Sequence, residues 1–409
     1  MKPNGDGKFI FKTMNFESIF LPSPADVCRL LGLPDNIVKM IPALEEHYAQ
    51  PLNVSRSSLA EITRSGVGMP TMNKLSHWMK KLPIPMKRLI HMPTMLKTYR
   101  AMRVGSNAGL WYSASNGFSL ASNDSELISL FDFISMRAEA DYKMVKGIKH
   151  LVRKGVIDKN DSNEVWQALL TTWQKCSLVP AEQLACYSLY AASPDDPILT
   201  NELEGTAVLK AVFHLVFDFY FSAIAHFEVG ISLYYMRCGA KDVSEQHRSL
   251  FSSAIHTFSI AIADERCSCF GAMLNELRTI LAKKELDSGW RALASYIDIE
   301  ESGQSMETLA DKQYRQLKDW RNGMNMPSAH KLRQFASNFV RELGGGEVDV
   351  NLVLDYLRIA NGIDTLVARF LEQGKDERVI AIIAEVLTEY PRYFEHYKQI
   401  ITTKGAQKA

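Results

Sequence analysis

One stretch near the C-terminal end, residues 320–339 (WRNGMNMPSAHKLRQFASNF), constrains the local fold more tightly than any other part of the chain. Gly323 lies three residues after Trp320, where a helix that ends needs a residue tolerant of positive φ. Pro327 and Ser328 are typical of the start of a following helix. The stretch therefore predicts a helix end, a tight turn and a second, amphipathic helix with an apolar stripe at Leu332, Phe335, Ala336 and Phe339.

A fainter copy of this pattern lies near the other end, where residues 64–78 align with residues 321–335 without a gap. Arg, Gly, Met, Pro, Lys and Leu recur at the same spacing, Thr71 replaces Ser328, and Trp78 replaces Phe335. The shared residues are those that end a helix, begin a helix and anchor it in a core. We therefore predict two helix-turn-helix-like modules.

The second module carries the sharper expectations. Trp320, Leu332 and Phe335 are large apolar residues at helical spacing, so we expect them to be buried between the helices of the module. We also expect Gly323 to adopt a positive φ.

The segment 317–339 resembles the helix-turn-helix of the phage-repressor type, the lambda-repressor-like or XRE-like family. That family often has an apolar residue followed three positions later by Trp and three positions after that by Gly. Pro-Ser begins four positions after the Gly, and Leu lies five positions after the Pro. The matching residues here are Leu317, Trp320, Gly323, Pro327 with Ser328, and Leu332.

The resemblance covers about residues 303–343, with the fainter copy near residues 52–82. It implies duplex DNA as the partner, read in the major groove by a short recognition helix over residues 314–321. The corresponding helix of the first copy begins within residues 54–59. The second module departs from the family in two respects: Leu309-Ala310 lies closer to Trp320 than the family's Leu-Ala lies to its Trp, and no Gly marks the usual turn between the two helices.

Charge adds a second signal around the first copy. Residues 62–123 contain no Asp or Glu, although the whole chain has a net charge of only +1. Such an asymmetry suits neutralisation of phosphates, because each Lys or Arg contact releases counterions from the nucleic acid. A solvated basic face with no ligand is the alternative. The basic residues of this window are Arg64, Lys74, Lys80, Lys81, Lys87, Arg88, Lys97, Arg100 and Arg103.

The candidate DNA-binding residues combine the basic window with polar positions on the two expected recognition helices. They are Arg56, Ser57, Arg64, Lys74, Lys80, Lys81, Lys87, Arg88, Arg315, Gln316, Lys318 and Arg321.

Composition places the chain among soluble globular proteins, with 46% hydrophobic and 23% charged residues over 409 positions. Six scattered cysteines have no disulfide-framework spacing, and the first residues lack the apolar run of a signal peptide. We therefore expect a reducing, cytoplasmic compartment and no membrane span.

The expected fold class is mainly α and multi-helical, with the two helix-turn-helix-like modules flanking a large helical body. Helices are expected at 26–31, 36–48, 125–154, 162–175, 180–192, 205–236, 244–262, 268–284, 287–300, 350–361, 364–373, 376–388 and 390–401. The segments 125–154 and 205–236 are each expected to form either one helix or two. The segment 105–123, rich in Gly, Ser and Asn, is predicted to be a linker or a hairpin around Asn116-Gly117.

The expected domain order places a basic N-terminal region first and the second module after the central helices. Its parts are 1–104, the linker or hairpin 105–123, a central helical domain 124–300, the module 301–343, C-terminal helices 347–401 and a disordered tail 402–409.

Few residues suggest other chemistry. His214, Asp218, His226 and Glu228 lie in the most apolar segment and could sketch a metal site, although buried polar groups with satisfied hydrogen bonds are the more ordinary interpretation. Cys267-Ser-Cys269 is a weak metal signal. Phosphate-loop, dinucleotide, nucleophile-elbow and zinc-protease motifs are absent, so we predict no metal, no cofactor and no enzymatic activity.

Two functions remain open at this point. The first is a DNA-binding protein of prokaryotic or phage type, either a transcriptional regulator or a component of a mobile-element or defence system. The alternative is a helical interaction or assembly protein in which the modules only pack. Double-stranded DNA is the expected partner of the first, protein chains are the expected partners of the second, and a homo-oligomer is compatible with both.

Overall fold

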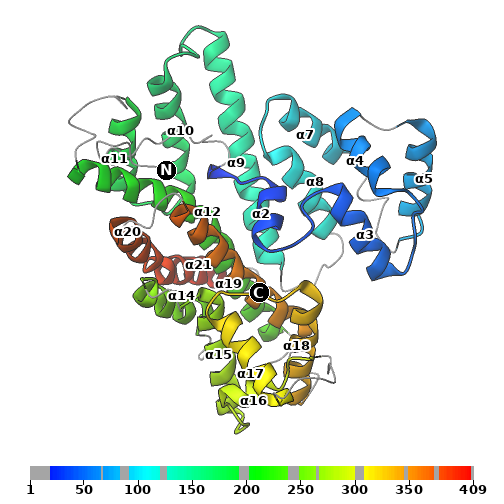
Figure 1. The fold of residues 1–409 in the computed structure, drawn as a ribbon. Coiled ribbons are helices and arrows are strands. Elements are labelled where there is room, and N and C mark those ends of the chain that lie inside the picture. The colour runs from blue at the N-terminus through cyan, green and yellow to red at the C-terminus, as the bar shows by residue number, and fades with distance from the viewer. Residues whose placement is uncertain are drawn as a thin grey trace. The chain divides into compact units, whose positions relative to one another are not determined.

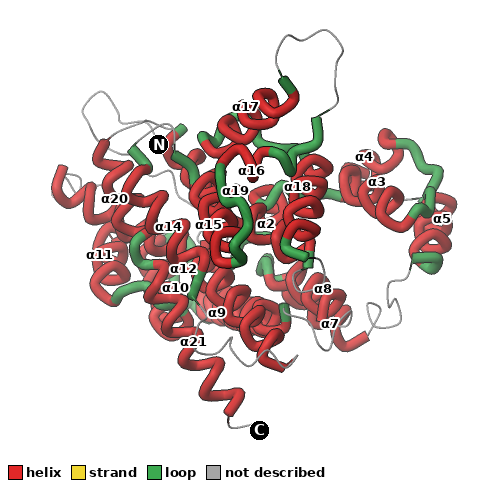
Figure 2. The backbone as a smooth tube through the Cα atoms, turned by 90° about the horizontal axis from the view of Figure 1, so that it is seen from below, coloured by secondary structure: helices red, strands yellow, loops and turns green. Residues whose placement is uncertain are grey.

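The computed structural model describes residues 19–65, 68–82, 92–119, 127–192, 202–237, 248–263, 267–299, 308–344, 349–372 and 377–406. Every regular element in these ranges is an α-helix, and none of the described residues forms a strand (Figure 2). The mainly α, multi-helical fold class is therefore confirmed. The described chain forms two compact units, which are treated separately: residues 30–32 and 248–396 belong to unit 1, and residues 19–29, 33–237 and 397–406 belong to unit 2.

This division differs from the expected domain order. The central helical domain expected over 124–300 is split, because its last part packs with the second helix-turn-helix-like module in unit 1. The C-terminal helix begins in unit 1 and ends in unit 2.

Unit 2 is a helical bundle in which most helices pack on their sequence neighbours. α7 packs on α8, α8 on α9, and α9 on both α10 and α12, while α11 lies against α10 and α12. Its helices are α2 (Pro24–Leu30), α3 (Ile37–Tyr48), α4 (Arg56–Ser65), α5 (Met69–Met79), α7 (Met92–Arg103), α8 (Ala108–Ser119), α9 (Ile128–Arg153), α10 (Ser162–Cys176), α11 (Ala181–Ala192) and α12 (Glu202–Arg237).

The long helix α12 is the core element of unit 2. By length and composition, its portion Gly205–Tyr235 is the one described helix apolar enough to cross a membrane, but 78% of the most apolar window is buried inside the fold. Apolar side chains cover nearly all of its circumference, as expected for a helix enclosed by others. Of the two sequence-based interpretations of 205–236, one buried helix or two abutting helices, the structure has the single helix.

A buried ion pair fixes α9 to α12. Arg137 Nη2 donates to Asp218 Oδ2 at 2.5 Å, and both side chains are at most 1% exposed. The remaining polar atoms of the pair bond to backbone, since Arg137 Nε donates to the Phe20 carbonyl at 2.9 Å and the Leu178 N–H donates to Asp218 Oδ1 at 3.0 Å. A buried pair with this many partners can offset the cost of its desolvation.

Unit 1 is built around α15, which packs against α14, α17 and α19. α18 also packs on α19, and α14 on α20. The helices of unit 1, coloured from green to red in Figure 1, are α14 (Leu250–Ala261), α15 (Cys269–Lys283), α16 (Trp290–Ala294), α17 (Leu309–Arg321), α18 (Ala329–Glu342), α19 (Val350–Leu371), α20 (Glu377–Leu387) and the first part of α21 (Tyr390–Ala406).

The linker or hairpin predicted over 105–123 is wrong over residues 108–119, which form α8, while residues 105–107 are a turn that precedes it. Ala108, Trp111, Tyr112 and Ser115 are buried, and their spacing makes one helical stripe. The indole N–H of Trp111 also donates to the carbonyl of Pro22 at 2.6 Å. Tertiary burial of this stripe outweighs the turn preference of Asn116-Gly117.

Three boundaries also differ from expectation. The helices expected at 350–361 and 364–373 form one continuous helix, α19, and only Trp290–Ala294 of the segment 287–300 is α-helical. The disordered tail predicted at 402–409 is wrong over 402–406, because α21 continues to Ala406.

Candidate nucleic-acid interfaces

The second module, α17 and α18 in unit 1, has the predicted turn. Gly323 adopts φ +69° directly after α17, which only a residue without a Cβ reaches without strain. Ser328 is the N-cap of α18, and its side chain accepts a hydrogen bond from the N–H of Lys331 at 3.3 Å. The predicted helix exit and helix entry are both confirmed.

The apolar anchors of this module are confirmed as well. Trp320 and Phe335 are fully buried, and their rings meet edge-on with centroids 5.8 Å apart. Leu332 is buried beside them, as is Leu317 at the position of the family's first apolar residue. These contacts hold α17 and α18 together.

The expected recognition helix is not a separate element. Residues 314–321 form the second half of α17, which is continuous from Leu309, where Thr308 caps it by accepting from the N–H of Asp311 at 3.2 Å. The missing Gly in this stretch accounts for the continuity, because nothing breaks the helical run. On α17, Arg315 and Lys318 are exposed and Gln316 is half-buried.

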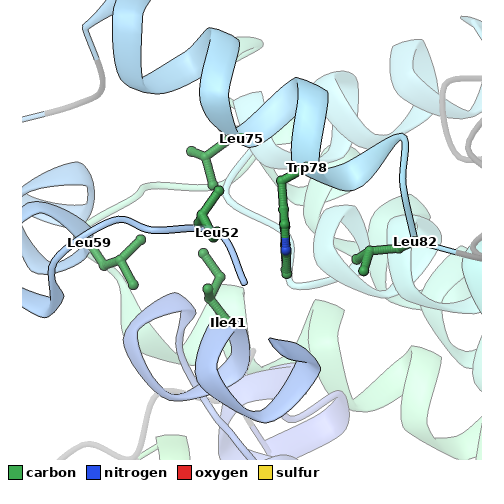
Figure 3. Packing of buried hydrophobic residues seen from close by; sticks show 6 residues of the cluster. All are labelled: Ile41, Leu52, Leu59, Leu75, Trp78 and Leu82. Carbon is green, nitrogen blue, oxygen red and sulfur yellow. The ribbon is translucent and has the colours of Figure 1, made fainter. Parts of the chain in front are cut away.

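The first module, in unit 2, also has a core of its own. Leu75 and Trp78 of α5 pack with Ile41 of α3, Leu59 of α4 and the loop residue Leu52 (Figure 3). Leu75 and Trp78 align with Leu332 and Phe335, so the two copies share their buried anchors.

The two copies differ in where the second helix begins. α5 starts at Met69 with Gly68 as its N-cap and Pro70 in its first turn, whereas α18 starts only after Ser328. Thr71, aligned with Ser328, therefore lies inside α5 instead of capping it. Proline fits the first turn of a helix because it needs no N–H partner there.

The exposed face of α5 and its C-terminal end are basic. Lys74, His77 and Lys81 recur at helical spacing, Lys80 lies beside them, and all four are exposed. None of them pairs with a carboxylate among the residues that the structure describes. This face therefore presents positive charge to solvent without internal neutralisation.

The remaining predicted residues of the first module are placed only in part. Arg56 and Ser57 are exposed in the first turn of α4, and the Ser57 hydroxyl lies 2.9 Å from that of Ser55. Arg64 lies in the last turn of α4, and its side chain is outside the described set, as are Lys87 and Arg88 entirely.

Residues 62–123 contain no Asp or Glu, but an acidic residue from elsewhere in the chain lies next to them in the fold. Lys97 of α7 forms an ion pair with Glu139 of α9 at 2.8 Å and lies 4.1 Å from the ring centroid of Tyr112. The hydrogen bond from Lys97 is the largest cause of the lowered pKa of Glu139, and the hydrogen bond from the Tyr112 hydroxyl also lowers it. Lys97 thus serves the packing of α7 and α9, while Arg100 and Arg103 are exposed.

The polar residues of α12 are not gathered into a site. Asp218 is paired with Arg137, and His226 lies with Nδ1 2.9 Å from the Ser129 hydroxyl, stacked on Phe133. The described part of the chain holds no cluster of three or more His, Cys, Asp or Glu that could bind a metal, and neither the α12 residues nor Cys267 and Cys269 form one.

Sequence reasoning missed Arg278 and Trp290, which lie next to the second module. Trp290 opens α16, and the guanidinium groups of Arg278 and Arg321 both lie over its ring. Arg321 is therefore packed on an aromatic side chain and is only half-exposed. The position of Trp290 directly after Ser288-Gly289 gave no motif that would have singled it out.

The comparisons with known proteins give no relative to reason from: no protein-family model, no curated protein and no solved structure matches this chain.

Proposed function

We propose that this protein binds duplex DNA through the phosphate backbone, with the exposed basic face of α5 as its principal contact. The observation that carries the proposal is the set Lys74, His77, Lys80 and Lys81, exposed together and unpaired with any described carboxylate. Lysines in that condition release counterions from a polyanion without first breaking an ion pair.

The mechanism follows from the two modules. A rigid core behind α5, anchored by Trp78 and Leu75, holds the basic face in one orientation. Arg56 and Ser57 on α4, and Arg315, Gln316 and Lys318 on α17, are the polar side chains proposed to reach base edges. Backbone contacts would then position the protein, and these side chains would supply sequence preference.

Such a protein fits a cytoplasmic regulator of prokaryotic or phage type, or the DNA-binding component of a mobile-element or defence system. That assignment rests on the resemblance of residues 317–339 to the phage-repressor helix-turn-helix, together with the buried anchors Trp320, Leu332 and Phe335.

One observation favours a second function, assembly with another protein. α7 exposes Met95, Tyr99 and Met102 at helical spacing, with Leu96 next to them, and these side chains are 46–63% exposed. An apolar stripe on an exposed helix is typical of a protein contact.

The decisive experiment is a salt titration of binding to a short labelled duplex of random sequence. The wild-type protein is compared with the triple variant Lys74→Ala, Lys80→Ala, Lys81→Ala. We expect weaker binding to every duplex, and a logarithmic salt slope that falls by roughly 0.9 for each phosphate that the variant no longer neutralises.

A matched variant controls for charge alone. Lys154→Ala, Lys159→Ala, Lys175→Ala removes the same charge from exposed positions around α9 and α10 and should leave binding unchanged. If the α5 variant and wild type give superimposable titrations, the α5 face is not the contact. If wild type binds no duplex even at low salt, the assembly function is favoured.

A further inference from the structure

Two arginines converge on one indole ring in unit 1. The Cζ atom of Arg321, the last residue of α17, lies 3.7 Å from the ring centroid of Trp290, and the Cζ atom of Arg278, from α15, lies 4.1 Å from it. Trp290 is the first residue of α16. Three different helices therefore bring these side chains together.

Hydrogen bonds hold the guanidinium group of Arg278 and the backbone of Arg321. Arg278 Nε donates to the carbonyl of Ser288 at 2.7 Å, and its Nη1 donates to Asn275 Oδ1 at 3.1 Å. The carbonyl oxygen of Arg321 accepts from the Ser268 hydroxyl at 2.8 Å, at the start of α15. The Arg278 side chain and the backbone that carries Arg321 are therefore both tied to neighbouring residues in the free protein.

Close packing reinforces this geometry. A Cβ atom added at Gly271, in the first turn of α15, would overlap the backbone carbonyl of Arg321. Glycine is needed there because the end of α17 lies directly against α15. The backbone that carries Arg321 is consequently fixed relative to the helix that carries Arg278.

Neither arginine is neutralised within the described part of the chain. No described carboxylate forms an ion pair with Arg278 or Arg321, whereas the neighbouring Arg291 lies 3.1 Å from Asp311. Burial lowers the pKa of Arg321, and the positive charge of Arg278 lowers it further. Two positive charges therefore lie against the same ring, and that of Arg321 is partly desolvated. A bound anion would stabilise both charges.

Hydrogen-bond donors are also left over. Arg321 makes no hydrogen bond with its guanidinium among the described residues, and Arg278 uses only Nε and Nη1. Arginine's planar fork is suited to the oxygens of phosphate groups, and stacking on an aromatic ring keeps that fork in a fixed plane.

We propose that Arg278 and Arg321, stacked on Trp290, bind one phosphate group of a nucleic-acid backbone. This inference rests on the proposed function and deepens it in unit 1. Arg321 is already a candidate from its place on the expected recognition helix, and Arg278 and Trp290 are added to it from outside that helix. The same chemistry would accept free pyrophosphate, so the two sources of phosphate are separated by experiment.

The test follows the fluorescence of Trp290 while either sodium pyrophosphate or an unlabelled duplex is added. Wild type is compared with Arg278→Gln, Arg321→Gln and the matched control Arg291→Gln, which removes an equal charge one residue from Trp290. We expect Arg278→Gln and Arg321→Gln each to weaken duplex binding about tenfold or more, and Arg291→Gln to match wild type. Trp290→Phe should abolish the fluorescence change and, in the titration with the labelled duplex, keep most of the affinity.

The variants Arg278→Lys and Arg321→Lys guard against misfolding, since each keeps the charge and the aliphatic stem; both should bind with intermediate affinity. Equal duplex affinity for wild type, Arg278→Gln and Arg321→Gln overturns this site and leaves the α5 contact standing. A different result would be that wild type binds pyrophosphate but no duplex, and that Arg278→Gln and Arg321→Gln no longer bind pyrophosphate. That result overturns both the nucleic-acid ligand and the proposed function, and it leaves a site for free phosphates.

Discussion

The indole N–H of Trp78 donates a hydrogen bond to the backbone carbonyl oxygen of Gln50, with the two atoms 2.6 Å apart. This bond joins α5 to the loop between α3 and α4. The Trp78 side chain therefore stabilises the first module through apolar packing and through a hydrogen bond. Its partner carbonyl belongs to the segment that also carries the buried Leu52.

Replacing Trp78 with Phe should therefore lower the free energy of unfolding of unit 2 by about 1–3 kcal/mol, because the Gln50 carbonyl loses its donor and the smaller ring leaves space. Hydrogen exchange measures the effect, followed at the α5 amides for Trp78→Phe and at the α17 amides for the control. Trp320→Phe is the matched control, since the buried Nε1 of Trp320 has no hydrogen-bond partner to lose. A decrease that is no larger for Trp78 than for Trp320 would show that the bond contributes little.

Trp320→Ala should cost unit 1 on the order of 3–5 kcal/mol, since a fully buried indole is replaced by a cavity between α17 and α18. Urea denaturation followed by circular dichroism measures the change. The exposed Lys318, on the same helix, gives the reference: Lys318→Ala should stay within about 0.5 kcal/mol of wild type.

Asp218→Asn should destabilise unit 2 by about 3–5 kcal/mol, because the guanidinium of Arg137 then remains buried without its counter-charge. Thermal unfolding at fixed pH and salt measures the destabilisation. The double variant Arg137→Met, Asp218→Leu removes both charges, so it should cost less than the two single changes added together. Strict additivity would contradict a direct interaction.

Asp364 makes the stability of unit 1 depend on pH, and the direction of that dependence follows from its pKa. Its carboxylate accepts from the N–H groups of Cys269 and Phe270 at 2.6 and 2.9 Å, at the start of α15. Burial raises its pKa to about 7, against the opposing effect of these two bonds and well above the ordinary value of 3.8. As pH rises from about 4 to 7, the carboxyl of Asp364 loses its proton in the unfolded chain and keeps it in the folded chain. The contribution of Asp364 to the free energy of unfolding therefore falls over this range and is constant above it.

The comparison with Asp364→Asn isolates this group. The amide cannot ionise, so urea midpoints of wild type should decline relative to the variant between mildly acidic and neutral pH. A constant difference across that range would mean that Asp364 keeps the same charge throughout.

Local patterns predicted most of the helices because their ends carry recognisable residues. Gly32, Gly155 and Gly323 all adopt positive φ near the ends of helices that the periodicity had placed. Gly362 falls in the gap between the two helices expected at 350–361 and 364–373, which form one helix, and its role is tertiary. A Cβ there would lie 3.4 Å from the Leu30 carbonyl oxygen and 3.3 Å from Leu31 Cδ2, so this glycine admits a neighbouring segment and breaks no helix.

The interfaces were less accessible to sequence reasoning because they depend on residues far apart in the chain. Nothing near Lys97 in sequence indicates that Glu139 neutralises it, and nothing near Arg321 indicates that Arg278 shares its indole. Periodicity identifies which face of a helix is buried, whereas the pairing of charges is decided by which helices meet.

The placement of Tyr397 has a consequence for synthesis of the chain. Its hydroxyl donates to the Ser222 hydroxyl at 3.1 Å, and its ring lies 4.3 Å from that of His226, so a residue of α21 completes the packing around α12. Roughly 160 residues separate the end of α12 from Tyr397, which translation at about 5–20 residues per second takes on the order of ten to thirty seconds to add. For much of that interval the longest of the described helices is already outside the ribosome with part of its surface uncovered, so unit 2 matures only after nearly all of unit 1 has been made.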